Sequence, residues 1–311
     1  MSAPVAILCS GQGGQHRDMF AWLGDVPEAA GIFEAASPYL DHTDPRQFVR
    51  AADESALFTN HAGQILCCTQ ALAAWAMLGD KRPSRVVLAG YSVGELAAWG
   101  CAGLFSPEQT LQLASLRAKA MDRAAPAGAG LAAIVGLSRA VLDPLLEAHG
   151  AHVAIVNGPD SVVVGGTAAA LDACLAAASH HGAITARRLR VSVPSHTPLL
   201  EAARTAFGAI LGRQHLHTEA DGIRLLSGID AETVRNPKAG LGKLAAQISQ
   251  TLLWSDCLEA CREAGAVVFL ELGPGAALSR MAENLPESPS ARSIEQFRSA
   301  AGVRDWLNKA G

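Results

Sequence analysis

Ser92 lies in a pattern that produces nucleophilic serines. The apolar run Arg85–Gly90 leads directly into Gly90-Tyr91-Ser92-Val93-Gly94, and an alanine-rich amphipathic run follows. A strand, a tight turn and a helix in this order place a serine hydroxyl on a strained elbow. The helix N-terminus would direct N–H groups at an oxyanion on the bound acyl group, and Val93 supplies the first of them. The pattern predicts acyl-serine chemistry, but the acceptor of the acyl group stays open.

A serine nucleophile needs a base, and ten histidines are available. His196 differs from the others because it follows a predicted strand, precedes a predicted helix and is flanked by Pro194 and Pro198. These prolines would fix the direction of its ring. From the residues alone, His196 is as consistent with a surface histidine as with a base.

Arg117 falls on an apolar stripe of the helix predicted to begin at Ser106-Pro107. An arginine among apolar positions needs an anion if it is buried. It could form an internal ion pair, extend its head group to solvent, or hold a carboxylate in a bidentate fork.

The elements that must position these residues alternate between strands and helices, which favours a largely parallel sheet. Between the glycines at 128–130 and Pro194, the order becomes β-α-β-β-α-β. We therefore expect an α/β fold with an α/β-hydrolase-like core, formed by residues 1–128 and 196–311. Residues 129–195 would form an inserted ferredoxin-like (βαββαβ) subdomain.

The bulk composition excludes several classes of protein. The chain has 311 residues, half of them apolar and 17% charged, and its net charge of −4 offers no basic surface for nucleic acid. The apolar stretch 65–78 is interrupted by Thr69 and Gln70 and is expected to fall short of a membrane span. No signal peptide is evident, so we expect a cytoplasmic protein. The seven cysteines lack a CxxC pair and metal-ligand spacing, which predicts buried, reduced thiols and no metal site.

Five motifs in order resemble the malonyl-CoA:acyl carrier protein transacylase family. They are the segment "SGQGGQ" (10–15), the segment "GYSVGE" (90–95), Arg117, "VPSH" (193–196) and the turn "GPG" (273–275). The resemblance covers nearly the whole chain. It implies transfer of malonyl from malonyl-CoA to an acyl carrier protein that bears a phosphopantetheine-type arm, with no metal and no cofactor beyond the substrate.

The resemblance also implies roles for individual residues. Ser92 would be the nucleophile and His196 the base, acting in a ping-pong mechanism through a malonyl-serine ester. The backbone N–H groups of Gln12 and Val93 would form the oxyanion hole. Arg117 would bind the free carboxylate of the malonyl group.

Further positions are implied at the edges of this site. Gln247 corresponds to a glutamine near the family's catalytic histidine, where a backbone carbonyl orients the ring, and Asn157 lies where the pantetheine arm is expected to pass. Because carrier proteins are usually acidic, Arg187, Arg188 and Arg190 are candidates for a docking surface, although an exposed strand face explains them equally well.

Tyr91 replaces the histidine that is usual in the family. The segment "GYSVGE" is typical of the transacylase subunit of malonate decarboxylase, whose carrier bears a phosphoribosyl-dephospho-CoA arm. A transacylase of fatty-acid or polyketide synthesis is the alternative. Two other classes stay open: a serine thioesterase or esterase, for which Asp221-Gly222 could supply a patatin-like dyad, and a non-catalytic scaffold subunit.

Overall fold

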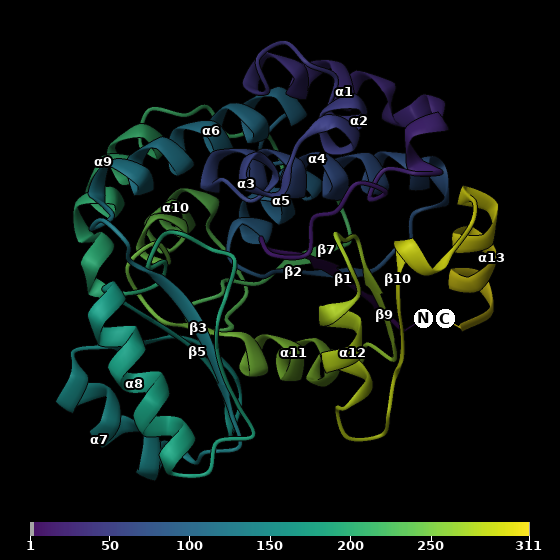
Figure 1. Cartoon of the computed structure of the whole chain (residues 1–311). Coiled ribbons are helices and arrows are strands. Elements are labelled where there is room, and N and C mark those ends of the chain that lie inside the picture. The colour runs from purple at the N-terminus through teal and green to yellow at the C-terminus, as the bar shows by residue number, and fades with distance from the viewer. Residues whose placement is uncertain (1–2, 311) are drawn as a thin grey trace.

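The computed structural model describes residues 3–310, whose strands form two five-stranded sheets. The first sheet is parallel throughout, in the order β10-β9-β1-β2-β7 (Figure 1). Its strands are β1 (Val5–Cys9), β2 (Val86–Gly90), β7 (Ile223–Leu225), β9 (Val268–Glu271) and β10 (Ser290–Ser293). The predicted α/β class with a parallel sheet is thereby confirmed.

Helices cover both faces of this sheet, and its central strand β1 is therefore buried on both sides. In β1, Ile7 packs into the core that contains helices α4, α5 and α6, whereas Leu8 packs into the core that contains α11 and α12. Figure 1 shows the first three helices above the sheet and the other two below it. Their bounds are α4 (Asn60–Leu78), α5 (Val93–Cys101), α6 (Pro107–Ala124), α11 (Trp254–Glu263) and α12 (Ala277–Glu283).

Helix α4 is the central buried helix of the molecule. With the turn that follows it spans Asn60–Lys81, which by length and composition alone could cross a membrane. The apolar stretch 65–78 is thus part of a longer helix than the sequence pattern indicated. However, 89% of its most apolar window is buried inside the protein, which is the property of a core helix.

The second sheet belongs mostly to the segment between the two halves of the first. Its order is β6-β3-β5-β4-β8, and the first four strands pair antiparallel. The elements are β3 (Gly130–Val135), α7 (Arg139–His149), β4 (His152–Gly158), β5 (Ser161–Gly166), α8 (Ala168–His180) and β6 (Thr185–Arg188). The fifth strand, β8 (Leu252–Leu253), comes from the other part of the chain and pairs parallel to β4.

Local capping signals place several helix ends where the sequence predicts them. Helix α6 begins after Ser106, whose hydroxyl accepts from the N–H of Gln109 while the Gln109 side chain accepts from the Ser106 N–H. This capping box fixes the helix that carries Arg117.

Other boundaries differ from the prediction. The last strand of the β-α-β-β-α-β segment, β6, ends at Arg188, well before Pro194. The helix predicted after His196 starts with a 3-10 turn, η5 (Pro198–Leu200). The remaining helices are α1 (Ala30–Ala36), α2 (Pro45–Ala51), α3 (Glu54–Leu57), α9 (Glu201–Leu211), α10 (Pro237–Ala246) and α13 (Ala300–Ala310).

Candidate active site

Ser92 occupies a strained backbone position between β2 and α5, with φ +58° and ψ −119°. Such a conformation is costly for a non-glycine residue and is concentrated at functional sites. The flanking glycines make the turn possible. A Cβ on Gly90 would lie 2.1 Å from the Glu95 nitrogen, and a Cβ on Gly94 would lie 2.0 Å from the Cys9 carbonyl oxygen. The spacing of the elbow motif is therefore a packing requirement.

Ser92 and His196 are hydrogen-bonded partners. The Nε2 atom of His196 lies 2.8 Å from the Ser92 Oγ, and its Nδ1 makes a short hydrogen bond to the Gln247 backbone carbonyl. Because a carbonyl only accepts, Nδ1 carries the proton and Nε2 is left free to accept from the serine. His196 is 1% exposed, so the alternative of a surface histidine is wrong.

The environment of His196 keeps its ring neutral. Burial, together with the nearby Arg117, lowers the pKa of His196 to about 3, although the hydrogen bond to Gln247 opposes both effects. A neutral imidazole with a free Nε2 can accept the serine proton. The group that orients His196 is thus a backbone carbonyl, whereas serine hydrolases have a carboxylate in this third position.

Arg117 is completely buried and has no acidic partner among residues 3–310. Its Nη1 donates to Gln64 Oε1 at 2.8 Å and its Nη2 to Gln247 Oε1 at 2.9 Å, and its Nε finds no acceptor in the same part of the chain. Burial lowers the pKa of Arg117 to about 10, so it stays a cation at neutral pH. An internal ion pair and a solvent-exposed head group are both excluded. The site holds a buried positive charge bonded only to neutral amides.

The loop after β1 brings Gln12 beside the elbow. A Cβ on Gly11 would lie 2.7 Å from the Tyr91 carbonyl oxygen and 3.4 Å from the Ser92 Cβ. The Gln12 side chain donates to the Asn60 carbonyl at the start of α4. Within residues 3–310, neither the Gln12 N–H nor the Val93 N–H has an acceptor, so both remain available for an oxyanion.

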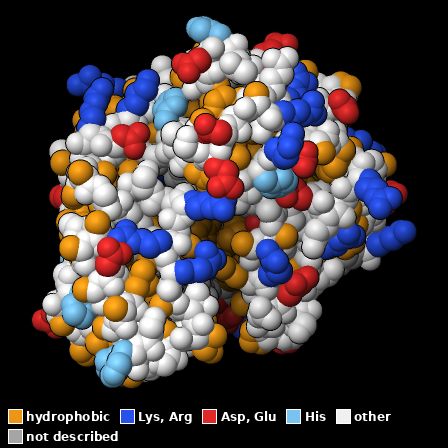
Figure 2. All heavy atoms as spheres, viewed as in Figure 1, with side chains coloured by type: hydrophobic (Ala, Val, Ile, Leu, Met, Phe, Trp, Pro, Cys, Tyr) orange, Lys and Arg blue, Asp and Glu red, His pale blue; other side chains and the backbone are white. Residues whose placement is uncertain are grey.

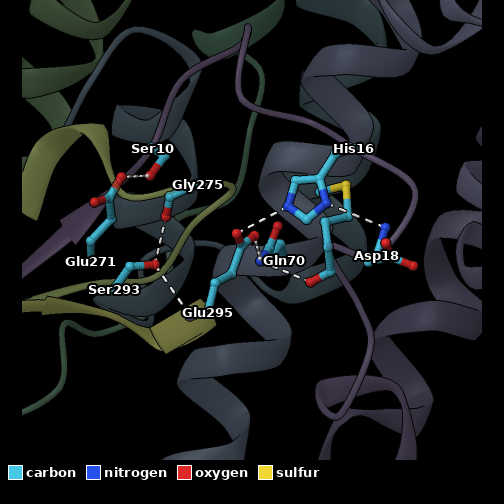
Figure 3. A network of polar contacts seen from close by, with 9 residues as sticks. Ser10, His16, Asp18, Gln70, Glu271, Gly275, Ser293 and Glu295 are labelled. Atoms are coloured by element: carbon cyan, nitrogen blue, oxygen red, sulfur yellow. Dashed lines mark hydrogen bonds and ion pairs between the residues drawn. The ribbon is translucent and has the colours of Figure 1, made fainter. Parts of the chain in front are cut away.

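A second polar cluster contacts the two ends of this loop, at Ser10 and His16 (Figure 3). Ser10 donates to Glu271 at 2.8 Å, and Glu271 also accepts from the Ser279 N–H. Farther along, Glu295 accepts from His16 at 3.0 Å and from Gln70 at 2.9 Å. The loop that carries Gln12 is thus held at both ends by buried or half-buried carboxylates.

A cavity of about 500 Å³ opens beside the loop, lined by residues 10–14, Tyr91, 189–191 and 274–278. Figure 2 shows this face hollowed between the two parts of the molecule, with Lys and Arg side chains around the hollow. Arg187, Arg190 and Arg280 line the cavity. Arg188 does not line it and pairs with Asp172 on α8, and Arg190 pairs with Glu54 at the edge of the cavity. Ser92, which is 9% exposed, is not among the residues that line this cavity, whereas its neighbour Tyr91 is.

Tyr91 joins the elbow to the smaller sheet. Burial raises the pKa of Tyr91 to about 12 and a hydrogen bond with Asn157 lowers it, so the phenol is neutral and not a base at neutral pH. Its ring packs edge-on against Trp254, with the centroids 5.3 Å apart. The structure therefore places Asn157 against Tyr91, outside the group formed by Ser92, His196, Arg117 and Gln247, and its Oδ1 finds no partner among the described residues.

The comparison with known proteins agrees with this geometry. A family model described as "Acyl transferase domain" matches residues 7–301. The chain belongs to the acyl transferase domain family. This acyl transferase is 28% identical to the malonyl CoA-acyl carrier protein transacylase of Haemophilus influenzae, over 97% of this chain and 98% of the relative. The expected resemblance to such transacylases and the prediction of an acyltransferase enzyme are confirmed.

Solved structures share the whole fold of the acyl transferase. The malonyl-CoA:acyl carrier protein transacylase of Xanthomonas oryzae superposes with a TM-score of 0.90 at 30% identity, covering 98% of this chain and 99% of that one. A malonyl-transacylase in complex with a type II polyketide synthase acyl-carrier protein superposes with a TM-score of 0.89 at 26% identity, covering 97% and 99%.

Sequence reasoning missed two residues that hold the acyl transferase site together. Gln64 is an amide in the otherwise apolar helix α4, and it accepts from Arg117. Glu95, on the elbow helix, accepts from the Gln247 side chain. An amide inside an apolar helix was the available signal for Gln64. Within residues 3–310, no three His, Cys, Asp or Glu side chains lie together as metal ligands.

Proposed function

We propose that this acyl transferase moves malonyl from malonyl-CoA to the thiol of an acyl carrier protein. The observation that carries the proposal is the buried Arg117, a cation without a protein anion that shares Gln247 with the Ser92–His196 pair. A free carboxylate on the acyl group would supply the missing charge, and guanidinium binds carboxylates in bidentate fashion. The names of the transacylase relatives support the same substrate.

The proposed reaction has two balanced steps. Ser92 Oγ attacks the thioester carbonyl carbon while its proton passes to His196 Nε2, and the C–S bond breaks as CoA leaves with that proton. The carrier thiol then gives its proton to His196 Nε2 and attacks the carbonyl carbon of the malonyl-Ser92 ester. The C–Oγ bond breaks, and His196 returns the proton to Ser92 Oγ. In both steps the N–H groups of Gln12 and Val93 would stabilise the oxyanion, and Arg117 would position the malonyl group.

Arg117→Ala tests the assignment of the substrate. Intact-mass measurement after mixing with malonyl-CoA or acetyl-CoA should show malonyl-Ser92 in the natural protein. The variant should form it about a hundredfold more slowly and shift its preference toward acetyl. Unchanged malonyl loading in the variant would reject the carboxylate role. No adduct on Ser92 in the natural protein would favour the scaffold alternative.

A hydrolase is disfavoured by the site. Asp221-Gly222 precedes β7, whereas Ser92 follows its parallel neighbour β2, so the two lie at opposite ends of the sheet. Comparing thioester hydrolysis with transfer to an added thiol separates the two activities.

We further propose that the carrier belongs to a malonate decarboxylase system, because Tyr91 stands in the "GYSVGE" pattern typical of its transacylase subunit. The polyketide and fatty-acid carriers are the alternative, and the carrier-bound malonyl-transacylase structure is their specific support. Transfer rates to carriers with the two kinds of arm, measured side by side, decide between them. The arginines that line the cavity, Arg187 and Arg190, are the proposed contacts for an acidic carrier, and Asn157 is proposed to lie near the arm.

The remaining fold and location assignments are also our proposals. We assign residues 1–128 and 196–311 to an α/β-hydrolase-like domain and residues 129–195 to a ferredoxin-like subdomain, on the element and strand orders described above. The protein is proposed to be cytoplasmic and to need no cofactor. Limited proteolysis should cut near the exposed junction at residues 127–128, because the other junction, at His196, is buried.

A further inference from the structure

Glu95 is a buried carboxyl group on the elbow helix that the proposed reaction does not use. It is 1% exposed, and its Oε2 accepts from the Gly228 N–H at 3.1 Å and from the Gln247 Nε2 at 2.9 Å. The approach depends on glycine, because a Cβ on Gly228 would lie 2.8 Å from this Oε2. Since a backbone N–H cannot become an acceptor, the atom opposite Gly228 must itself be an acceptor.

This requirement passes on to the Gln247 side chain. Its Nε2 donates to Glu95 and to the Ser92 carbonyl, which leaves its Oε1 facing the Arg117 guanidinium at 2.9 Å. If the Gln247 amide were flipped, its NH2 group would face the Arg117 guanidinium, which is also a donor. Its oxygen would then face the Ser92 carbonyl and the Glu95 carboxyl oxygen, which are both acceptors. A buried polar contact of that kind costs the full desolvation of each unmatched group.

We propose that Glu95 is a positioning residue: through the Gln247 side chain it fixes the Arg117 guanidinium in the orientation that receives the carboxylate of the acyl group. Glu95 touches neither substrate nor reacting atoms in this scheme. The inference rests on the proposed function, since it assumes that Arg117 binds an acyl carboxylate.

The positioning role of Glu95 depends on the length of its side chain and on the acceptor at its end, and not on its charge. Burial raises the pKa of Glu95 to about 7, against hydrogen bonds from Gly228 and Gln247 and attraction from Arg117, while Asp230 raises it. The Cys257 thiol also faces it. Glu95 is therefore partly protonated at neutral pH, and its Oε2 accepts in either state. A neutral amide of the same length should replace it.

Two near-isosteric variants separate reach from charge. Glu95→Gln keeps the length and the acceptor but loses the charge, whereas Glu95→Asp keeps the charge and is one methylene shorter. Rates of malonyl-Ser92 and acetyl-Ser92 formation are measured by intact mass, with fluorophosphonate labelling of Ser92 as a probe that needs no carboxylate site. We expect E95Q to keep the malonyl-to-acetyl rate ratio within about threefold, and E95D to lower it about tenfold with labelling little changed.

Asp230→Asn is the matched control, because it removes a charge that acts on Glu95 but does not contact Gln247. Its rate ratio should match that of the natural protein. The proposal is overturned if E95D keeps the ratio, if E95Q loses as much as E95D, if D230N lowers the ratio, or if labelling falls in parallel with it. The proposed function fails separately, if the natural protein forms no malonyl-Ser92.

Discussion

Two polar clusters lie next to the elbow that carries Ser92, and they balance charge in opposite ways. In the amide cluster (Gln64, Glu95, Arg117 and Gln247), the guanidinium meets two amide oxygens and no carboxylate. In the carboxylate cluster (Ser10, His16, Gln70, Glu271 and Glu295), each carboxylate meets donors within the protein. The second cluster is complete without a ligand, whereas in the first no carboxylate contacts the guanidinium directly.

Under the proposed function, the amide cluster would be a binding site and the carboxylate cluster a structural support. Leaving a buried charge without a partner is expensive, and a protein retains such a group where a ligand completes it. Matched carboxylates beside the Gln12 loop instead hold backbone in place. The two clusters should therefore respond differently to exchanges between amide and carboxylate, since such exchanges change charge but little shape.

The largest effect is expected from giving the amide cluster its missing anion. Gln64→Glu places a carboxylate on Arg117 without touching Ser92 or His196. Malonyl-Ser92 formation should fall about a hundredfold and acetyl-Ser92 formation much less, because the substrate carboxylate must compete with the new one. Stopped-flow acylation with the two thioesters measures this, and equal loss with both would contradict the comparison.

A smaller effect concerns the pH dependence of stability. The folded pKa of Glu95, about 7, lies above its unfolded value near 4.5, so the folded state binds more protons between them. This contribution is fully present below pH 4.5 and is lost as the pH rises through 7. Between pH 5 and 8, the natural protein should lose about 2 kcal/mol of unfolding free energy relative to E95Q. Urea unfolding of both proteins at the two pH values tests the sign, and a constant difference would reject it.

Neutralising the carboxylate cluster should cost stability and leave selectivity unchanged. Glu295→Gln removes the partner of a half-exposed His16, whose pKa that carboxylate raises. We expect a loss of about 1 kcal/mol in the free energy of unfolding, and no change in the malonyl-to-acetyl rate ratio. A changed ratio in this variant would mean that the two clusters are not independent.

The smallest effect is expected at Tyr91. Tyr91→Phe removes the hydrogen bond with Asn157 but keeps the packing on Trp254. Because the phenol is neutral and is not the base, the rate of malonyl-Ser92 formation should stay within about threefold. A loss above a hundredfold in single-turnover acylation would assign Tyr91 a chemical role.

Local signals made part of this site predictable. The strand–glycine–serine–glycine–helix spacing around Ser92 and the capping box at Ser106 each depend on neighbouring residues only. Arg117 and His196 could be selected as candidates from their flanks. Their burial could not, because it depends on contacts with α4 and with the segment around Gln247, far away in the sequence.

The elements that sequence patterns missed are short or atypical. Strand β10 reads Ser-Ala-Arg-Ser, without apolar alternation, and β8 has two residues. Both exist because a neighbouring strand offers them an edge, which is a property of the folded sheet. Glu95 and Gln64 escaped for the same reason, since their partners are fixed only when α4, α5, α6 and the Gln247 segment pack together.

Strand β8 has a mechanical consequence. Leu252 pairs with Ile155 of the smaller sheet, and a few residues earlier the Gln247 carbonyl holds His196. The segment 247–253 thus links the position of the smaller sheet to the orientation of the His196 ring. The smaller sheet cannot move away from the rest of the molecule without breaking the β4–β8 pairing or displacing the segment 247–253. If an acyl-carrier arm is the acceptor, as proposed, it would have to reach Ser92 with the two sheets held together.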